Sequence, residues 1–446
     1  MSEWKKVKIG EFLKQYRNTI YVDDAQQYRQ VTISSKDGVK YRCTKIGKEI
    51  GRKRQFLIDL KKYPNTVIFT RQGLHEGSIG LAPEEVDSCI ATENMPMFSV
   101  DDTVIDTQYL KNLLRSSIFA NLVSTLTPTG SAQKSIHERD LLPLEISIPN
   151  LETQKKIVKD ISSQLEKTEQ LSFEIAKQKA YAKQLRQNIL QEAIEGKLTA
   201  DWRKQHPVQK GNPDYDAEAL FDKIQAEMSE AKSTKKSLAP IAKDEIPFEI
   251  PTGWKWVRLG GICEGFMYGT SAKSLPYGKC PVLRMGNIQN GKIDWEKLVY
   301  TNNDEEMEKY LLKQYDLLFN RTNSREMVGK TAIFESTQKT IYAGYLVKFR
   351  PIKSNPYFVN IVLNSKTHRE WCNEVKTDAL GQSNINAEKL KNFITPLPPL
   401  AEQKEIVARV EQHLQTITQL ETQIATRETT TKQLMQSILK DAFEEG

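Results

Sequence analysis

The chain has 446 residues, a formal net charge of +7 at pH 7 and a pI near 8.8. This length exceeds one ordinary hydrophobic core, so roughly two to four domains are expected. No apolar run approaches the roughly 18 residues of a membrane-spanning helix, and the start lacks the plan of a signal peptide. These features predict a cytoplasmic protein without a membrane partner. The five cysteines are widely spaced, which argues against zinc or disulfides and favours buried thiols.

Residues 1–147 predict a compact α/β domain with a twisted, mostly antiparallel sheet. Short alternating segments such as Thr66–Phe69 are separated by Gly, Asn and Asp, and a helical stretch is expected over Gln108–Leu122. About nine Lys or Arg lie between Arg42 and Arg71, against Glu49 and Asp59. Such a density suits a polyanion, although a solvated surface is the alternative.

Residues 148–197 predict a long conserved helix, and residues 398–446 predict a second one. Positions 152–195 and 401–443 contain no proline, and their apolar residues recur mostly at steps of three, four or seven. A helix of about 43 residues is roughly 65 Å long and needs a partner of the same period. The predicted helix–helix contacts are Ile157, Ile161, Leu165, Leu171, Ile175, Leu185, Ile189, Ile406, Val410, Leu414, Leu420, Ile424, Leu434 and Ile438.

Residues 198–250 predict a polar linker with one amphipathic helix near 216–233, followed by a Ser/Thr/Lys stretch at 231–236. Residues 251–397 predict a second α/β domain. Its strands include 317–319 and 331–334, and a helical stretch is expected over 355–374.

Two segments of the second domain suggest different chemistry. The segment Gly286–Lys292 fits G-x-x-x-x-G-K, but Ile293 stands where a phosphate-binding loop needs Ser or Thr, and no helix follows. We therefore interpret it as a strand, an Asn-Gly turn and a strand. The segment Phe319–Lys330 presents two Arg, a Lys and several amides after an apolar strand, which suits phosphates and base edges. An ordinary polar turn is the alternative.

A third candidate is the polar approach to the last strand of each domain, residues 129–134 and 381–384. Gln and Asn can pair with adenine, or they can cap a turn. The candidate DNA contacts of the first domain are Lys45, Lys48, Arg52, Lys53, Arg54, Arg71, Gln72, His75, Ser131, Gln133 and Lys134. Those of the second are Arg284, Asn287, Asn320, Arg321, Asn323, Ser324, Arg325, Lys330, Gln382, Ser383 and Asn384.

The second half of the chain repeats the first. Gln154 recurs as Gln403, 249 positions later, and the match runs without a gap for about 48 residues at roughly 40% identity. The Trp-led starts of the two domains also match, whereas the domain interiors share little else. This indicates a repeated scaffold of helices and framing strands whose two domains differ in their interior segments. An antiparallel helix pair with one body at each end is the simplest arrangement; separate dimerisation helices are the alternative.

With these motifs the chain resembles the specificity (S) subunit of type I restriction–modification enzymes over essentially its whole length. The most specific features are Leu397–Ile406, its degenerate copy at Ile148–Ile157, and Glu195–Arg203. Leu283–Ile288 and Phe319–Asn323 also fit, whereas the first domain departs from these last patterns at Thr70 and Gln72–Gly73.

The resemblance implies an α+β fold in which each domain recognises one half of a bipartite, asymmetric target in duplex DNA. It also implies that the paired helices form a spacer that docks two modification (M) subunits, through which restriction (R) subunits join. S-adenosylmethionine, ATP and Mg²⁺ are expected in those partners, which methylate adenine N6 and cleave DNA in phage defence. The sequence lacks the methyltransferase Asn/Asp-Pro-Pro-Tyr/Phe motif and a Walker motif, so we assign no catalytic, cofactor-binding or metal-binding residue.

Other functions stay open at this point. A nuclease or methyltransferase in its own right would need a carboxylate set or a cofactor loop. A coiled-coil adaptor would bind protein through its two domains. The recognition subunit of a type IIB-like enzyme, or of another bacterial or archaeal defence complex, would share the same architecture.

Overall fold

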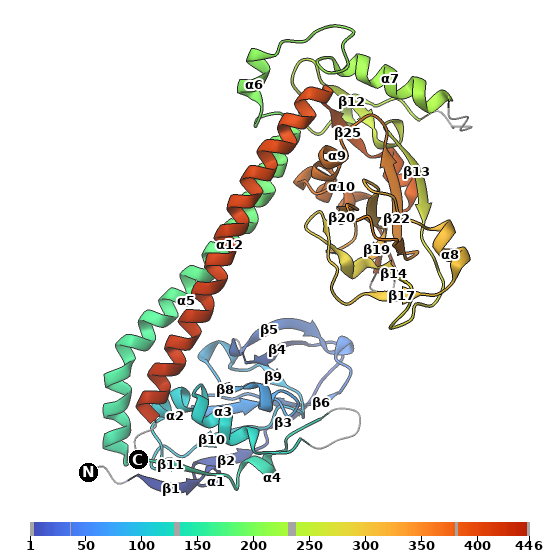
Figure 1. The fold of residues 1–446 in the computed structure, drawn as a ribbon. Coiled ribbons are helices and arrows are strands. Elements are labelled where there is room, and N and C mark those ends of the chain that lie inside the picture. The colour runs from blue at the N-terminus through green and yellow to red at the C-terminus, as the bar shows by residue number, and fades with distance from the viewer. Residues whose placement is uncertain (1–3, 36, 129–133, 231–237, 380–381, 444–446) are drawn as a thin grey trace. The chain divides into compact units, whose positions relative to one another are not determined.

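The computed structural model describes residues 4–35, 37–128, 134–230, 238–379 and 382–443 (Figure 1). The predicted contacts Ser131 and Gln133 and the polar stretch 231–236 lie outside these residues. The chain divides into a first unit, residues 1–177 and 424–446, and a second unit, residues 178–423. Within the described ranges, no helix is both long and apolar enough to cross a membrane.

The first unit contains two sheets and a two-stranded ribbon. β1 pairs with β11; the sheets run β2-β10-β7-β8 and β3-β6-β9-β4-β5, and their only parallel pair among the described strands is β4 with β9. Its elements are β1 Lys5–Lys8, α1 Ile9–Phe12, β2 Leu13–Tyr16, β3 Thr19–Tyr21, β4 Gln27–Ser34, β5 Gly38–Ile46, β6 Arg54–Leu57, β7 Thr66–Phe69, β8 Ile79–Leu81, β9 Ile90–Ala91, β10 Met97–Val100, α2 Thr107–Leu114, α3 Ser117–Ser124, α4 Glu138–Leu141 and β11 Glu145–Ile148.

The second unit is built on the same plan with different additions. β12 pairs with β25, and the sheets run β13-β22-β18-β20, β17-β14-β21 and β19-β24-β23, besides the β15-β16 hairpin. Its elements are α6 Ala200–Gln205, α7 Ala217–Glu230, β12 Lys255–Arg258, β13 Cys263–Tyr268, β14 Cys280–Leu283, β15 Ile288–Gln289, β16 Lys292–Ile293, β17 Val299–Thr301, α8 Asp304–Lys309, β18 Leu317–Asn320, β19 Thr322–Asn323, β20 Thr331–Ile333, β21 Ile341–Tyr342, β22 Leu346–Pro351, α9 Pro356–Val362, α10 Lys366–Val375, β23 Thr377–Ala379, β24 Gln382–Asn384, α11 Ala387–Asn392 and β25 Ile394–Leu397.

The repeat therefore includes a central sheet that the sequence barely shows. β2-β10-β7-β8 and β13-β22-β18-β20 have the same strand order, and Phe69 on β7 occupies the place of Phe319 on β18. The turn between β15 and β16 has Asn290 at φ 48° and Gly291 at φ 80°, as a type I′ hairpin requires. The α+β fold class and the hairpin are confirmed.

The two predicted helical stretches are helical, and each contains a break that the sequence did not reveal. The stretches 108–122 and 355–374 each consist of two helices, α2 and α3, and α9 and α10. The second helix of each pair begins at a serine N-cap, Ser116 or Ser365, whose hydroxyl accepts a hydrogen bond from a backbone N–H three residues later. These serines lie 249 positions apart and belong to the repeat.

The segment predicted as a linker belongs to the core of the second unit. The amphipathic helix forms as α7, and its Leu220, Ile224 and Met228 are buried against Trp254 and Val257 in one hydrophobic cluster. A stripe of apolar residues on a polar helix is typical of a helix that packs on a body. Residues 217–230 are therefore structural rather than connecting.

The long helices are α5 Leu151–Ile194 and α12 Leu400–Phe443, and both contribute to both units. In the first unit the early residues Ile161 and Leu165 of α5 share a core with Leu439 and Phe443 at the end of α12. In the second unit the last turns of α5 share a core with the first turns of α12. The predicted antiparallel pairing is confirmed.

The contact line between these helices differs from the predicted one. Buried positions on α5 recur every seven residues, and the equivalent positions on α12 are buried as well. On α5 they are Ile161, Thr168, Ile175 and Ala182, and their counterparts on α12 are Val410, Ile417, Ile424 and Thr431.

Four of the predicted contacts are wrong: Leu171, Leu185, Leu420 and Leu434 are 42–47% exposed. Leu171 and Leu185 precede positions 172 and 186, which continue the seven-residue spacing from the buried Leu165; one residue turns each leucine about 100° away from that row. Ser172 and Arg186 occupy the places that a regular apolar repeat would fill.

Each α/β domain, residues 1–147 or 251–397, is called a head below. A buried glutamine fixes each head to the start of the long helix that follows it. Gln154 accepts a hydrogen bond from the N–H of Asp106, the N-cap of α2, and donates to the carbonyls of Val104 and Pro149. Gln403 accepts from the N–H of Asn355, the N-cap of α9, and donates to the carbonyl of Pro398. Both side chains are fully buried.

Arg71, predicted to contact DNA, has its guanidinium engaged inside the first unit. Its Nε and Nη2 donate to both carboxylate oxygens of Glu138 on α4, at 3.0 and 2.7 Å. Burial alone would raise the pKa of Glu138, but the hydrogen bonds and charge of Arg71 outweigh it, so the pKa lies at about 2. Arg71 is a structural residue here, because a bidentate, largely buried pair leaves it few free donors.

Replacing Gln403 with Ala is expected to destabilise the second unit by about 3 kcal/mol, because buried backbone groups lose their partners. Gln154→Ala should do the same to the first unit. Urea unfolding gives the free energy, and hydrogen exchange locates the loss. Gln419→Ala, at an exposed position of α12, is the matched control. A loss within about 0.5 kcal/mol of this control would contradict the role of the buried amides.

The Arg71–Glu138 pair also predicts a pH dependence. Because the carboxyl pKa is depressed on folding, its stabilising contribution is complete above the ordinary value near 4.5 and disappears as the pH falls toward about 2. Arg71→Ala should lower the urea midpoint at pH about 5.5 and flatten its decline between pH about 4.5 and about 3. Arg139→Ala, on the same helix and exposed, is the control. Parallel pH profiles for wild type and Arg71→Ala would contradict the assignment.

Candidate nucleic-acid interface

Two of the predicted polar motifs of the second unit come together in one small sheet. β19 follows β18 directly and pairs with β24, so that Thr322 lies opposite Asn384 and Asn323 opposite Ser383. Asn384 Nδ2 donates to Thr322 Oγ1 at 2.7 Å. The segments 321–325 and 382–384, about 60 residues apart in sequence, therefore form one polar surface.

The exposed groups of this surface lie on β19, on the turn that follows it and at the start of β24. Arg325 is 77% exposed and approaches Asp378 on β23 at 3.8 Å, an ion pair too exposed to hold the guanidinium strongly. Ser324 and Gln382 are also exposed, and Asn323 is half-buried. These side chains offer charged and amide donors to phosphates or base edges.

Arg321 is positioned by an aromatic ring. Its guanidinium lies over Tyr268 at 4.5 Å from the ring centroid, and its backbone N–H donates to the carbonyl of Tyr345 at 3.0 Å. Its Nε has no hydrogen-bond partner within the described part of the chain. This Nε is buried, and Nη1 approaches the carbonyl of Gly344 at 3.5 Å, so the ring and the backbone fix the orientation of the guanidinium.

Three predicted contacts are wrong because their side chains are buried. Asn287 is 4% exposed; its amide donates to the carbonyls of Asp294 and Glu296 and accepts from the N–H of Arg284, so it holds the hairpin together. Ser383 is 1% exposed and donates to Asp378. Asn320 is fully buried at the end of β18. None of the three presents its polar atoms to a ligand in this conformation.

The other predicted contacts of the second unit lie apart from this surface. Arg284 is exposed beside the hairpin and donates to the carbonyl of Lys297 at 3.1 Å. Lys330 is half-buried and donates to Gln289 Oε1 at 3.0 Å.

In the first unit the basic residues follow β5, the adjoining turn and β6. Lys48 and Arg52 are exposed, Lys45 is half-buried, Lys53 pairs with Asp24, and Arg54 pairs with Glu93 at 3.2 Å. Gln72 and Lys134 are exposed, and His75 lies 3.7 Å from Glu76. Since two of the cations already have carboxylate partners, the free positive charge is smaller than the sequence suggests.

Sequence reasoning missed two residues of the surface around β19 and β24, and one exposed aromatic residue elsewhere in the second unit. Tyr268 supports Arg321, and Asp378 contacts both Arg325 and Ser383. Tyr277 is 84% exposed and follows β13 on a loop. An isolated Tyr in a segment without periodicity gives no signal in one sequence; only its exposure identifies it as a possible stacking group.

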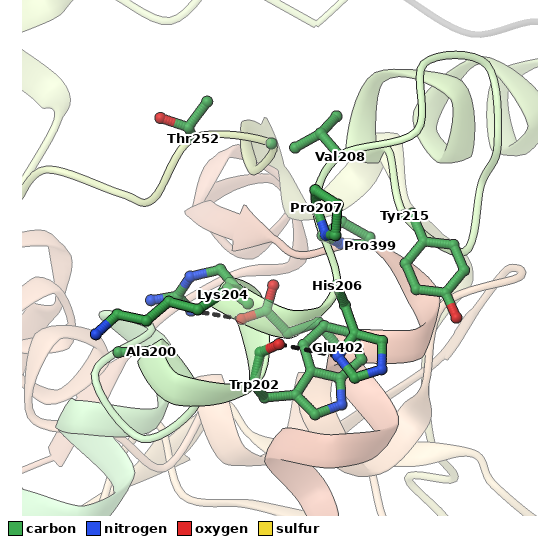
Figure 2. Close-up of a pocket in the computed structure, with 12 residues that line it drawn as sticks. Ala200, Trp202, Lys204, His206, Pro207, Val208, Tyr215, Thr252, Pro399 and Glu402 are labelled. Atoms are coloured by element: carbon green, nitrogen blue, oxygen red, sulfur yellow. Dashed lines mark hydrogen bonds and ion pairs between the residues drawn. The ribbon is translucent and has the colours of Figure 1, made fainter.

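The segment that follows α5 organises the start of α12. Gly196, at φ 73°, ends α5 in the left-handed conformation, and Thr199 and Arg203 both donate to Glu402. Glu402 also accepts from the indole of Trp254 at 2.7 Å. Trp202 and His206 stack beside it, with ring centroids 4.1 Å apart, in a pocket of about 360 Å³ (Figure 2). The run Glu195–Arg203 thus fixes the second head to both helices.

The comparisons with known proteins agree on one family. Residues 1–178 and 251–427 match the type I restriction modification DNA specificity domain. The chain is 27% identical over 351 residues to the EcoKI specificity subunit of Escherichia coli K12, covering 77% of this chain and 66% of that protein. It is 35% identical over 167 residues to the MjaX specificity subunit of Methanocaldococcus jannaschii, a protein described as putative, covering 35% of this chain and 39% of that one.

The chain thus aligns with about two fifths to two thirds of the length of these relatives. A chain from a solved type I R-M system shares its fold, with a TM-score of 0.55 at 20% identity, over 99% of this chain and 97% of that one. With both halves matched by the family, this chain belongs to the type I restriction–modification DNA specificity family.

Proposed function

We propose that this chain is the sequence-reading subunit of a type I restriction–modification complex, in which each head reads one half of a bipartite, asymmetric site in duplex DNA. The observation that carries the proposal is the combination of a repeated frame with unlike contact loops. The central sheets share one strand order, whereas the loop after β18 carries Arg321 and Arg325 and the loop after β7 carries Gln72 and His75. Two heads that recognised the same half-site would need the same contact loops. The unlike loops therefore fit two different half-sites.

The proposal assigns catalysis to partner subunits in a bacterial or archaeal cytoplasm. A modification subunit would bring S-adenosylmethionine to adenine N6, and a restriction subunit would use ATP and Mg²⁺. This chain would place those subunits on the target, and the restriction subunits would join through the modification subunits.

Mapping methylated adenines in DNA from a host that carries this chain with its partners tests the proposal. We expect one new motif with two short half-sites of different sequence, separated by unspecified bases. A single uninterrupted motif, or no new motif, would overturn it. A salt titration of duplex binding separates it from a protein-binding adaptor, because phosphate contacts weaken steeply with salt.

The four exposed leucines support docking of two modification subunits. Leu171 and Leu420 are 249 positions apart, and so are Leu185 and Leu434. The first unit holds Leu171 and Leu434, and the second holds Leu185 and Leu420. Each unit thus exposes one leucine of each repeated pair, outside the contact line of the helices. Equivalent apolar positions in two units fit two copies of one partner.

Replacing Leu171 and Leu434 with Asp should remove one modification subunit and leave the other bound. Burying a leucine contributes about 1.5–3 kcal/mol, so the double change should weaken docking by more than about 100-fold. The mass of the purified complex measures the loss. Phe173→Asp is the control, because Phe173 is 69% exposed on α5 but its repeat counterpart is Thr422. Retention of both partner subunits would argue against these docking faces.

Arg325→Ala should weaken binding at the half-site read by the second head by about 10-fold and relax base preference there. Preference at the other half-site should stay unchanged. Binding to a panel of duplexes, with each half-site varied in turn, measures both effects. Arg52→Ala in the first head is the reciprocal control, with its effect on the first half-site. If each variant lost affinity equally at both half-sites, neither arginine would contribute to recognition of one particular half-site.

A further inference from the structure

A cavity of about 950 Å³ lies in the second unit between α5 and the head. Its walls come from α5 residues 180–190, the turn of the β15-β16 hairpin, the loop that ends at Lys330, and α9 and α10. Helix α5, expected to space the heads and dock partner subunits, therefore also forms one wall of a cavity in the second unit.

The cavity has a large excess of positive charge. Its lining includes Lys183, Arg186, Lys330, Lys366 and Arg369, and its one lining carboxylate is Glu326. Arg186 pairs with Glu421 at 3.0 Å and Lys366 with Glu370 at 3.6 Å. Within the described residues, the other three have no carboxylate within ion-pair distance: Arg369 donates to backbone carbonyls, Lys330 donates to the Gln289 amide, and Lys183 lies opposite on α5.

The charged form of Lys330 is disfavoured in this conformation. Burial, followed by the charges of Arg369 and Lys183, lowers its pKa. Like charges gathered around a half-buried ammonium destabilise the site until an anion enters. The side-chain amides of Asn360 and Asn364, also in the lining, already donate to the carbonyls of Gly291 and Thr331, so the lysines and arginines supply the cavity's charge. A cluster of this composition is suited to phosphate oxygens.

We propose that this cavity holds phosphate groups of the DNA backbone, contacted by Lys183 of α5 and Lys330 of the second head. The inference rests on the proposed function and extends it: the long helix contacts DNA as well as spacing the heads. DNA is favoured over a free phosphate because the loop Arg321–Lys330 leads from the exposed Arg325 to the cavity. One strand could thus contact both.

The first unit lacks this set of charges at the equivalent positions. Lys183 recurs as Lys432 and Arg186 as Met435, but the strand register places Ser78 where the second unit has Lys330. A phosphate clamp at this place therefore belongs to the second half of the chain alone. This difference gives an internal reference for the experiment.

The test measures binding of the full-length chain to its mapped target duplex across a range of salt concentrations. Lys183→Gln/Lys330→Gln should reduce the slope of log affinity against log salt by about 1 for each phosphate group that the variant no longer binds. Preference among bases should stay unchanged. Lys183→Arg/Lys330→Arg should keep the slope, and Lys210→Gln, an exposed lysine outside the lining, is the control. The single variant Lys183→Gln changes an exposed side chain, so it tests the helix contact without disturbing the half-buried Lys330.

The outcomes separate this proposal from the proposed function. If the wild-type chain shows no salt-dependent duplex binding, the proposed function itself fails. If the wild type binds its target steeply but both Gln variants keep its slope, only the cavity proposal fails. A second arm adds inorganic triphosphate. If triphosphate raises the melting temperature of the wild type but not of the double variant, and the DNA slope is unchanged, the site takes a small phosphate ligand and the DNA assignment is overturned.

Discussion

The buried amide of Gln154, and of its counterpart Gln403, is the interaction on which the rest of the structure depends. A long polar helix has few means of fixing a small α/β head to its first turn, because its apolar face is used by the partner helix. The glutamine solves this with one side chain, which joins the proline-bounded end of the last strand to the N-cap of a head helix. Full burial makes these hydrogen bonds costly to lose, so the head cannot turn freely about the helix start.

The antiparallel pairing of the long helices determines which residues make up each hydrophobic core. Helix α5 begins at the first head but ends in the core of the second unit, where Ala193 and Ile194 are buried. Helix α12 begins at the second head and ends in the core of the first unit, where Phe443 packs edge-on against Tyr109. Each core therefore contains residues from both copies of the repeat. Neither half of the sequence contains a complete core, which couples the folding of the two units.

Periodicity explains what the sequence could predict. A spacing of seven residues over many turns defined both helices to within a residue or two, and Asn290-Gly291 defined its hairpin, because both signals are local. The contact line of the helices was harder. Leu171 and Ile175 are both apolar at helical spacing, and only the packing shows that Thr168, rather than Leu171, faces the partner helix. The breaks between α2 and α3 and between α9 and α10 could not be predicted. In one sequence, a serine within an amphipathic pattern can be either a helix N-cap, as Ser116 and Ser365 are, or an ordinary surface residue.

Site residues were predicted least well, for a physical reason. Asn and Arg have the same donors whether they bind DNA or hold a loop together, so composition cannot separate Asn287, which closes a hairpin, from Asn323, which lies on the surface. Arg71 and Arg325 both sit in loops after a buried strand, yet Glu138 engages the first bidentately whereas Asp378 only approaches the second. That difference depends on carboxylates 67 and 53 residues away in sequence. The strands β7 and β18 of the repeated central sheet are buried along their whole length and cannot contact DNA bases. Specificity in such a frame has to reside in the connections between strands, where the two halves differ, and that is why one sheet order can serve two different readers.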